Sequence, residues 1–423
     1  MPLTSAPGDS CAGTWLPCGV LPKGVWSNGP MESNDRSSLT PDSTPSTKRS
    51  PSRSAAAAPP LVNWDLAAST AAAMVAPGPK MSAREIRAAV ADLRAAADAS
   101  VAHVHRITGL EAARDLRDSD VLVVDRASWA RANSQSFSVL MGPALQHLAE
   151  TRPEQLAAAN TALGGTMTGA QLGSVLAFLS SKVLGQYDPF AALGGVGKPG
   201  GRLLLVAPNI ITLERELNVE PADFRLWVCL HEQTHRVQFA AAPWLRGHML
   251  EQISLLSNGM MDKAQTLSER LGSAVKALAA NPSGKGGRDE DGVPGKPADL
   301  LSLLQDPEDK ERLSHLTAVM SLLEGHANVV MDAVDASIVP SVKTIRQRFN
   351  NRGAKRGWID RFFRQIMGLD AKMRQYSDGA RFVRSVTDRV GMEGFNRVWE
   401  RPENLPTEAE IHSADLWITR MGL

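Results

Sequence analysis

Two histidines and a glutamate stand close together between Leu226 and Phe239, in a His-Glu-x-x-His pattern at positions 231 to 235. On an α-helix, residues four positions apart differ by about 40° around the axis and roughly 6 Å along it, so the imidazoles of His231 and His235 can reach one metal ion. Glu232 could then take a proton from a water molecule on the open side of that ion. The spacing therefore predicts a zinc site with a general base.

The residues around this motif carry the signals of a helix. Pro221 suits a first-turn position, Asp223 favours the positive N-terminal end, and Pro243 should end the helix near Ala241. An apolar surface is provided by Phe224, Trp227, Val228, Leu230 and Val237. The two histidines are thus expected in the middle of a helix, on rigid backbone.

A catalytic zinc ion usually has three protein ligands and a water molecule, so this site needs one more ligand. Glu324 is the best candidate, and His326 is its rival because imidazole binds zinc as readily. The two positions lie about 160° apart around a helix, so both should not bind the same ion. His326 could instead stabilise an oxyanion or make a hydrogen bond in the core. Tyr187, His315 and Tyr376 are further candidates for the oxyanion role.

Length and composition favour an ordinary globular protein. The 423 residues, 43% of them hydrophobic, can form a sizeable core, and a net charge of +1 gives no case for nucleic acid or a membrane surface. No apolar run approaches the ~18 residues that could span a bilayer, and the N-terminus lacks the pattern of a secretion signal. Cys11, Cys18 and Cys229 form no disulfide framework. We therefore expect a cytoplasmic protein.

The chain divides into a leader and one domain. Residues 1–60 are rich in Ser, Pro, Thr and Gly and are expected to be disordered, whereas 61–423 should form the metallohydrolase domain, with a flexible insertion at about 281–298. The fold class is mainly α, of the α+β type, with a small sheet beside the metal helix. Helices are expected over 82–99, 129–149, 154–163, 167–184, 251–280 and 307–339, and strands over 121–124 and 202–210, with a connector at 214–217.

A basic run covers residues 343–364 and mixes arginines and lysines with aromatic side chains. A solvated helix face is the simpler interpretation of this run. A patch for an anionic ligand or for nucleic acid is the alternative.

The stretch Glu324-Gly-His-Ala327 is similar to the Glu-Gly-x-Ala motif of the gluzincin branch of the zincin metallopeptidases. That resemblance implies that Glu324 is the zinc ligand. It also implies an acid four residues later that orients the first histidine, but this sequence has Asn328 there and its next acid at Asp332. An Asn carbonyl can accept the same hydrogen bond, without the charge that raises the basicity of the ligand.

Further stretches extend the resemblance from residue 61 to the end of the chain: 62–65, 124–129, 185–188, 207–209, 243–245, 368–376 and 405–408. They resemble a zincin-like family of bacterial proteins that is widespread in actinobacteria. Its members are described as hydrolases, as zinc-dependent metalloproteases or as proteins associated with biosynthesis of the deazaflavin coenzyme.

The resulting hypothesis is a zinc-dependent hydrolase, first of all a metallopeptidase that acts on a peptide or amide substrate. A non-catalytic zincin-fold binding protein and a small-molecule amidase or biosynthetic hydrolase are the alternatives. A peptidase needs an open groove, which is expected beside the strand from Leu203 to Ile210, whereas an amidase needs a closed pocket. The sequence does not indicate an oligomeric state.

Overall fold

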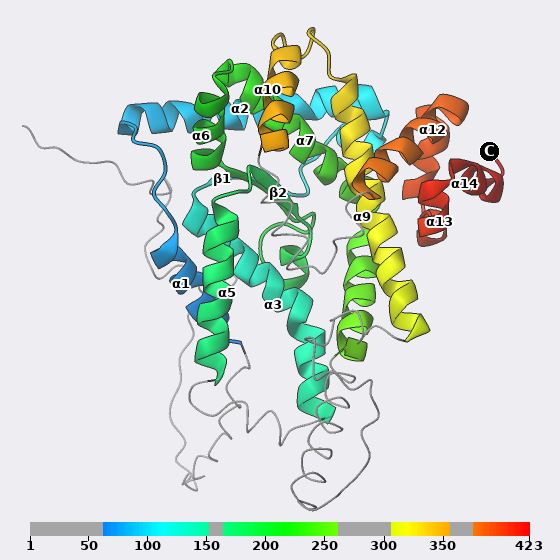
Figure 1. The fold of residues 1–423 in the computed structure, drawn as a ribbon, viewed down its shortest axis with the longest axis horizontal. Coiled ribbons are helices and arrows are strands. Elements are labelled where there is room, and N and C mark those ends of the chain that lie inside the picture. Colours follow the sequence, from blue (N-terminus) through cyan, green and yellow to red (C-terminus); the bar gives the residue numbers. More distant parts are fainter. Residues whose placement is uncertain (1–61, 152–163, 261–305, 356–374) are drawn as a thin grey trace, which may run out of the picture.

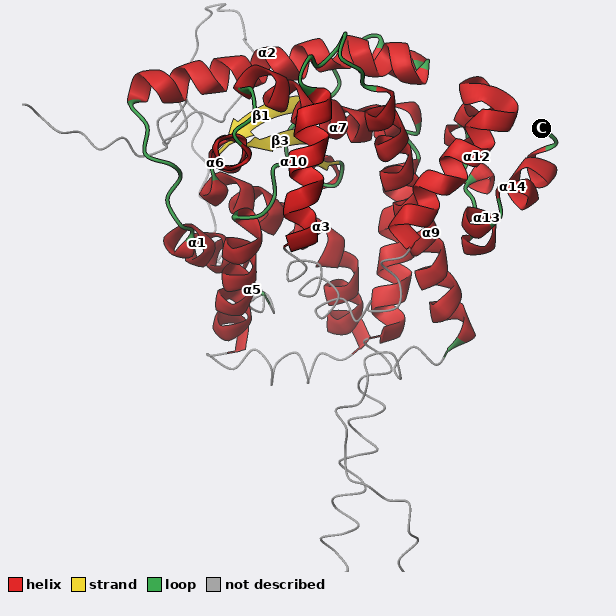
Figure 2. Cartoon of the chain, turned by 45° about the horizontal axis from the view of Figure 1, so that its top comes forward, coloured by secondary structure: helices red, strands yellow, loops and turns green. Residues whose placement is uncertain are grey.

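The computed structural model describes residues 62–151, 164–260, 306–355 and 375–423 (Figure 1). Its described part is mostly helical, and the helices surround a small three-stranded sheet (Figure 2). This agrees with the predicted mainly α fold with a small sheet. The expected leader, the helix at 154–163 and the insertion at 281–298 lie outside the described residues.

The sheet has the order β1-β3-β2. Strand β1 (Asp120–Val124) pairs in parallel with β3 (Arg202–Val206), and β2 (Gly185–Asp188) pairs with β3 in the antiparallel direction. Every residue of β3 is buried, which explains its continuous apolar sequence. The central strand therefore has both of its edges occupied.

The strand expected over 202–210 is shorter than predicted. It ends at Val206, and helix α6 (Ala207–Leu217) begins at once because Pro208 fits the first turn of a helix. The side-chain amide of the buried Asn209 donates to the backbone carbonyls of Ser180 and Val183 and holds this turn in place. The connector expected at 214–217 is accordingly the last part of a helix.

Three helices pack together around the sheet residues Leu204 and Val206. These are α1 (Trp64–Met74), α3 (Arg126–Thr151) and α5 (Gly164–Ser180), which lie side by side in Figure 1. Helices α1 and α5 are close enough that a Cβ at Gly173 would lie 2.6 Å from the carbonyl oxygen of Ala67.

Helix α2 (Ala83–Thr108) crosses the molecule and packs on α7 (Pro221–Ala241). A capping box of Ser82 and Glu85 begins α2, which runs past the expected end to Thr108 and is followed by Gly109, where the backbone has a positive φ of 64°. Helix α7 has the predicted bounds. It is tied to α6 by a buried pair in which Arg225 donates two hydrogen bonds to the carboxylate of Glu214, at 2.7 and 3.0 Å.

Helix α9 (Pro307–Ala333) packs against α12 (Gln375–Asn396), while a further helical segment covers 245–260. Helix α9 ends at Ala333 and not near 339 as expected. Arg346 of α10 (Val342–Lys355) donates to the last backbone carbonyls of α9, and Arg348 donates to the end of α6. Two arginines of the basic run therefore satisfy helix C-termini. Short helices α13 (Glu408–His412) and α14 (Ala414–Met421) complete the chain.

Within the described residues, no helix combines the length and the apolar character needed to cross a membrane.

Candidate metal centre

Three side chains from α7 and α9 converge at the crossing of these helices. His231 and His235 lie on α7 and Glu324 on α9, and one ligand atom of each residue lies within 4.8 Å of the other two. Nε2 of His235 is 3.6 Å from Oε1 of Glu324, and Nε2 of His231 is 4.0 Å from Oε2. The side chain of His231 is 30% exposed and that of Glu324 33%, so the site opens to solvent.

Gln238 determines which nitrogen of His235 carries the proton. The amide nitrogen of this buried glutamine lies 2.8 Å from the carbonyl oxygen of Leu323 and 3.0 Å from Nδ1 of His326. A carbonyl can only accept, so the amide nitrogen must face it, and Oε1 of Gln238 then accepts from Nδ1 of His235 at 3.0 Å. In the tautomer that this hydrogen bond favours, the second ring nitrogen of His235, which faces Glu324, is the one that can bind a metal.

The donor set fits a divalent cation. Burial, with a smaller effect from neighbouring His235, lowers the pKa of His231 to about 3, so this ring is neutral at pH 7. Two imidazoles and one carboxyl group thus face the same small space. This is the three-ligand set that catalytic zinc takes when its fourth position stays open.

Glu232 lies on the same helix beside this group, and it is 8% exposed. Its carboxyl packs on Gly185, the first residue of β2, where a Cβ would lie 2.6 Å from Cγ and 3.0 Å from Oε1 of the glutamate. Burial, with a further contribution from the charge of Glu324, raises the pKa of Glu232 to about 8 when no cation is bound. A buried carboxyl with a raised pKa is suited to exchange protons near neutral pH.

Gly325 explains how α9 can deliver Glu324 to this place. A Cβ at Gly325 would lie 2.3 Å from the backbone carbon of Gly379 on α12, and a Cβ at Gly379 would lie 2.0 Å from the carbonyl oxygen of Ser321. The two helix backbones therefore cross in direct contact. The glycine next to the glutamate serves this packing, and any larger residue would push the helices apart.

Of the other residues expected near the metal, His326 lies closest. It is completely buried between the rings of Phe395 and Trp399, and it reaches His235 only through Gln238. The group of three described residues that can share a metal ion contains Glu324 and not His326.

Asn328 and Asp332 are not placed as the resemblance implied. Asn328 is exposed on α9, and the structure records no hydrogen bond between it and His231. Asp332 forms an ion pair with Arg384. The hydrogen bond to a motif histidine comes instead from Gln238, which contacts the second histidine, His235.

Two further oxyanion candidates are engaged elsewhere. The buried hydroxyl of Tyr187 donates to the carbonyl oxygen of Gly200, and burial raises its pKa. Nε2 of His315 lies 2.7 Å from Nε2 of His248. The side chain of Tyr376 lies outside the described residues.

Sequence reasoning missed Gly185 and Gln238. Gln238 stands three residues after His235, a spacing at which helix side chains meet, so the motif could have been extended to it. Gly185 carried no such signal, because its role depends on where β2 lies relative to α7.

The fold and the site together define a class of protein: a helical domain in which a His-Glu-x-x-His helix and a glutamate from a second helix could hold a metal ion beside a small sheet. The chain belongs to the family of zincin-like metallopeptidases, whose model matches residues 62–418. At the level of this family it is a zinc-dependent hydrolase.

The fold is also similar to a solved structure from Chloroflexus aurantiacus, described as a "putative hydrolase with a novel fold". The two chains are 28% identical with a TM-score of 0.57, and the match covers 85% of this chain and 99% of that one. A search of curated proteins returned no significant match. The association of some family members with a deazaflavin coenzyme is not tested by these comparisons.

Proposed function

We propose that the protein is a zinc-dependent peptidase in which His231, His235 and Glu324 hold the metal and Glu232 is the general base. The convergence of these three ligand atoms within 4.8 Å, with the carboxyl of Glu232 buried beside them, is the observation that carries the proposal.

Zinc held by this set would polarise the scissile carbonyl and make water acidic enough to lose a proton near pH 7. Glu232 takes that proton and passes it to the nitrogen of the leaving amine. Such a proton transfer contributes roughly 100- to 10,000-fold to the rate. Gly185 leaves room for the carboxyl of Glu232 to rest on β2, which fixes its distance from the three ligands.

The substrate groove expected beside β3 is excluded, because that strand is buried between β1 and β2. The strand that touches the general base is β2, which pairs on one side only among the described residues. Gly185 and Gln186 are partly exposed, whereas Tyr187 and Asp188 are buried. An extended peptide could therefore add its backbone to the first half of β2, over a short length.

The proposal is tested by comparing the peptide products that wild type and Glu232→Gln release from a denatured cell lysate. The variant should keep stoichiometric zinc and lose turnover, because the amide occupies the same volume but cannot take a proton. Equal cleavage by both proteins would contradict the role of Glu232.

The same proteins, assayed also with small acyl amides, separate the rival functions. A zinc-loaded wild type that releases no peptides but hydrolyses small acyl amides would be the small-molecule amidase. A protein with zinc and neither activity would be the non-catalytic binding protein.

A further inference from the structure

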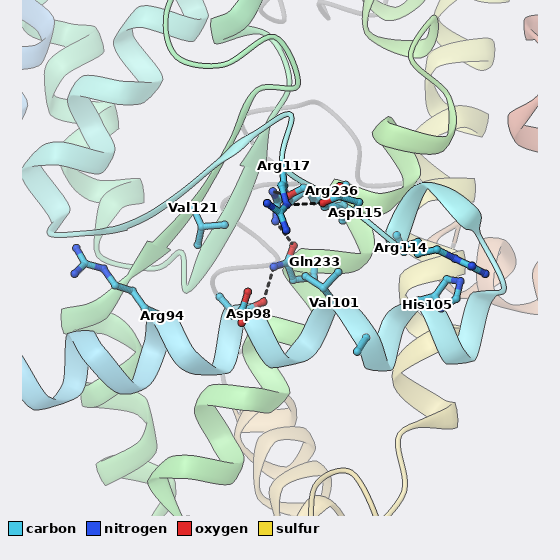
Figure 3. A pocket seen from close by; sticks show the side chains of 14 residues that line it. Arg94, Asp98, Val101, His105, Arg114, Asp115, Arg117, Val121, Gln233 and Arg236 are labelled. Atoms are coloured by element: carbon cyan, nitrogen blue, oxygen red, sulfur yellow. Dashed lines mark hydrogen bonds and ion pairs between the residues drawn. The ribbon is translucent and has the colours of Figure 1, made fainter.

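The face of α7 opposite the metal centre borders a pocket of about 520 Å³ (Figure 3). Its long side is α2, and its floor is made by Gln233 and Arg236 of α7. Gln233 fixes the two helices to each other, because its amide nitrogen donates to the carbonyl oxygen of Ala97 at 2.7 Å. The pocket therefore lies within the rigid part of the fold.

Arg236 is a buried cation, and its ion-pair partners are absent among the described residues. It is 4% exposed, and its guanidinium donates to the hydroxyl of Ser119 and to the carbonyls of Leu116 and Ser119. All of these acceptors are neutral, and within the part of the chain that the structure describes Arg236 has no ion pair. Burial lowers the pKa of Arg236, and the charges of Asp118 and Asp120 offset only part of this effect. An anion in the pocket would offset that cost.

Besides Arg236, the residues that line the pocket include three arginines and two aspartates. Arg117 and Arg236 lie in the same part of the pocket in the view of Figure 3, and the only ion pair of Arg117 among the described residues is with the exposed Asp115. Arg94 and Arg114 mark opposite ends of the pocket along α2 (Figure 3). Positive charge is therefore distributed along the pocket.

Apart from His105, the remaining lining is apolar and formed mainly by small side chains, as at Ala97, Val101 and Val121. A pocket of this volume admits a small organic molecule and not merely an inorganic ion. Guanidinium groups match the oxygen atoms of phosphate in a fixed, planar geometry, and a phosphate monoester carries up to two negative charges at pH 7.

We propose that this pocket binds a small phosphorylated molecule, with its phosphate between Arg117 and Arg236 and its organic body along α2. The site is separate from the metal centre, since α7 lies between them. It does not depend on the proposed peptidase activity.

The test is calorimetric titration of the full zinc-loaded chain with phenyl phosphate, whose ring and dianion match the two parts of the pocket. Wild type should bind at one saturable site, while phenol should not bind. Arg117→Glu should weaken binding at least tenfold, because it places a negative charge beside the phosphate. Arg87→Glu, a matched change at an exposed position of α2 outside the pocket, should leave the affinity unchanged.

Arg117 and Arg87 are both exposed, so the two variants should fold. Circular dichroism checks this. The proposal is overturned if wild type shows no saturable binding below about 10 mM, a range weaker than ordinary specific recognition. It is also overturned if Arg117→Glu binds as well as wild type. Binding that persists in that variant and disappears in Glu324→Ala would place the phosphate on the metal instead.

Discussion

Gly185 of β2 and Glu232 of α7 are in contact at a point where only a glycine fits. A Cβ at position 185 would lie 2.6 Å from Cγ of the glutamate and 2.7 Å from its Cδ. Strand β2 thus packs directly against the carboxyl of Glu232, the proposed general base. A side chain at position 185 would displace this carboxyl.

We predict that Gly185→Ala lowers kcat by at least about 100-fold, since a displacement near 1 Å can cost that much. Zinc content should stay stoichiometric, because the three ligands do not touch Gly185. Gly142→Ala is the control, as a Cβ at position 142 of α3 meets nothing within 4 Å. Full activity of the Gly185 variant would show that Glu232 does not need its support from β2.

Gln238 should control zinc affinity through His235. Gln238→Leu removes the acceptor for Nδ1 of His235 and also leaves the carbonyl of Leu323 without a donor. We expect zinc to bind about 10- to 100-fold more weakly, measured by competition with a chelator. Nitrogen NMR of the metal-free protein should show His235 losing its fixed tautomer. Gln171→Leu, at an exposed position of α5, is the control, and equal zinc affinity of the two variants would contradict this role.

Glu324→Ala should lose most of its zinc, which metal analysis of the purified protein measures. Without Glu324 only the two histidines of α7 would bind the ion, and two ligands give a lower zinc affinity than three. Asn328→Ala should keep its zinc, because Asn328 is exposed. Stoichiometric zinc in the Glu324 variant would mean that another side chain completes the site.

The pH dependence of stability should reveal the buried carboxyl of Glu232 in metal-free protein. Its pKa is about 8 in the folded chain and near its ordinary value of 4.5 in the unfolded chain, so unfolding between these values releases a proton. The free energy of unfolding then falls as pH rises, by up to about 1.4 kcal/mol per pH unit. Glu232→Gln has no such proton to release. The free energy of unfolding of this variant, relative to that of wild type, should therefore increase from about pH 5 to about pH 8.

Urea unfolding in the presence of a chelator measures this difference. Burial also lowers the pKa of His231 and of His326 to about 3, which makes stability rise with pH below about 6.5. Both proteins share that contribution, so it cancels in the comparison. A difference between the two proteins that does not change with pH would contradict the buried, protonated state of Glu232.

Local signals allowed much of the fold to be predicted. Proline positions and apolar periodicity determined the bounds of α7, and the β-branched run at 121–124 identified β1. The strand at 202–210 was predicted too long, because an apolar run does not distinguish a strand from the buried helix that follows it. Helix α9 was also predicted too long, since its end depends on Arg346 from a later helix.

The sequence by itself predicted the proposed chemistry. Two histidines and a glutamate within five residues of one helix are local information, and helix geometry is enough to place the two imidazoles on one face. The sequence also favoured Glu324 through its resemblance to a known motif, but His326 stayed an alternative until the tertiary structure placed both residues. Glu324 faces the histidines, His326 is turned into the core behind Gln238, and Gly185 makes room for Glu232. These relations depend on how α9, α12 and β2 pack against α7, and contacts between segments far apart in the chain leave no periodic pattern in the sequence.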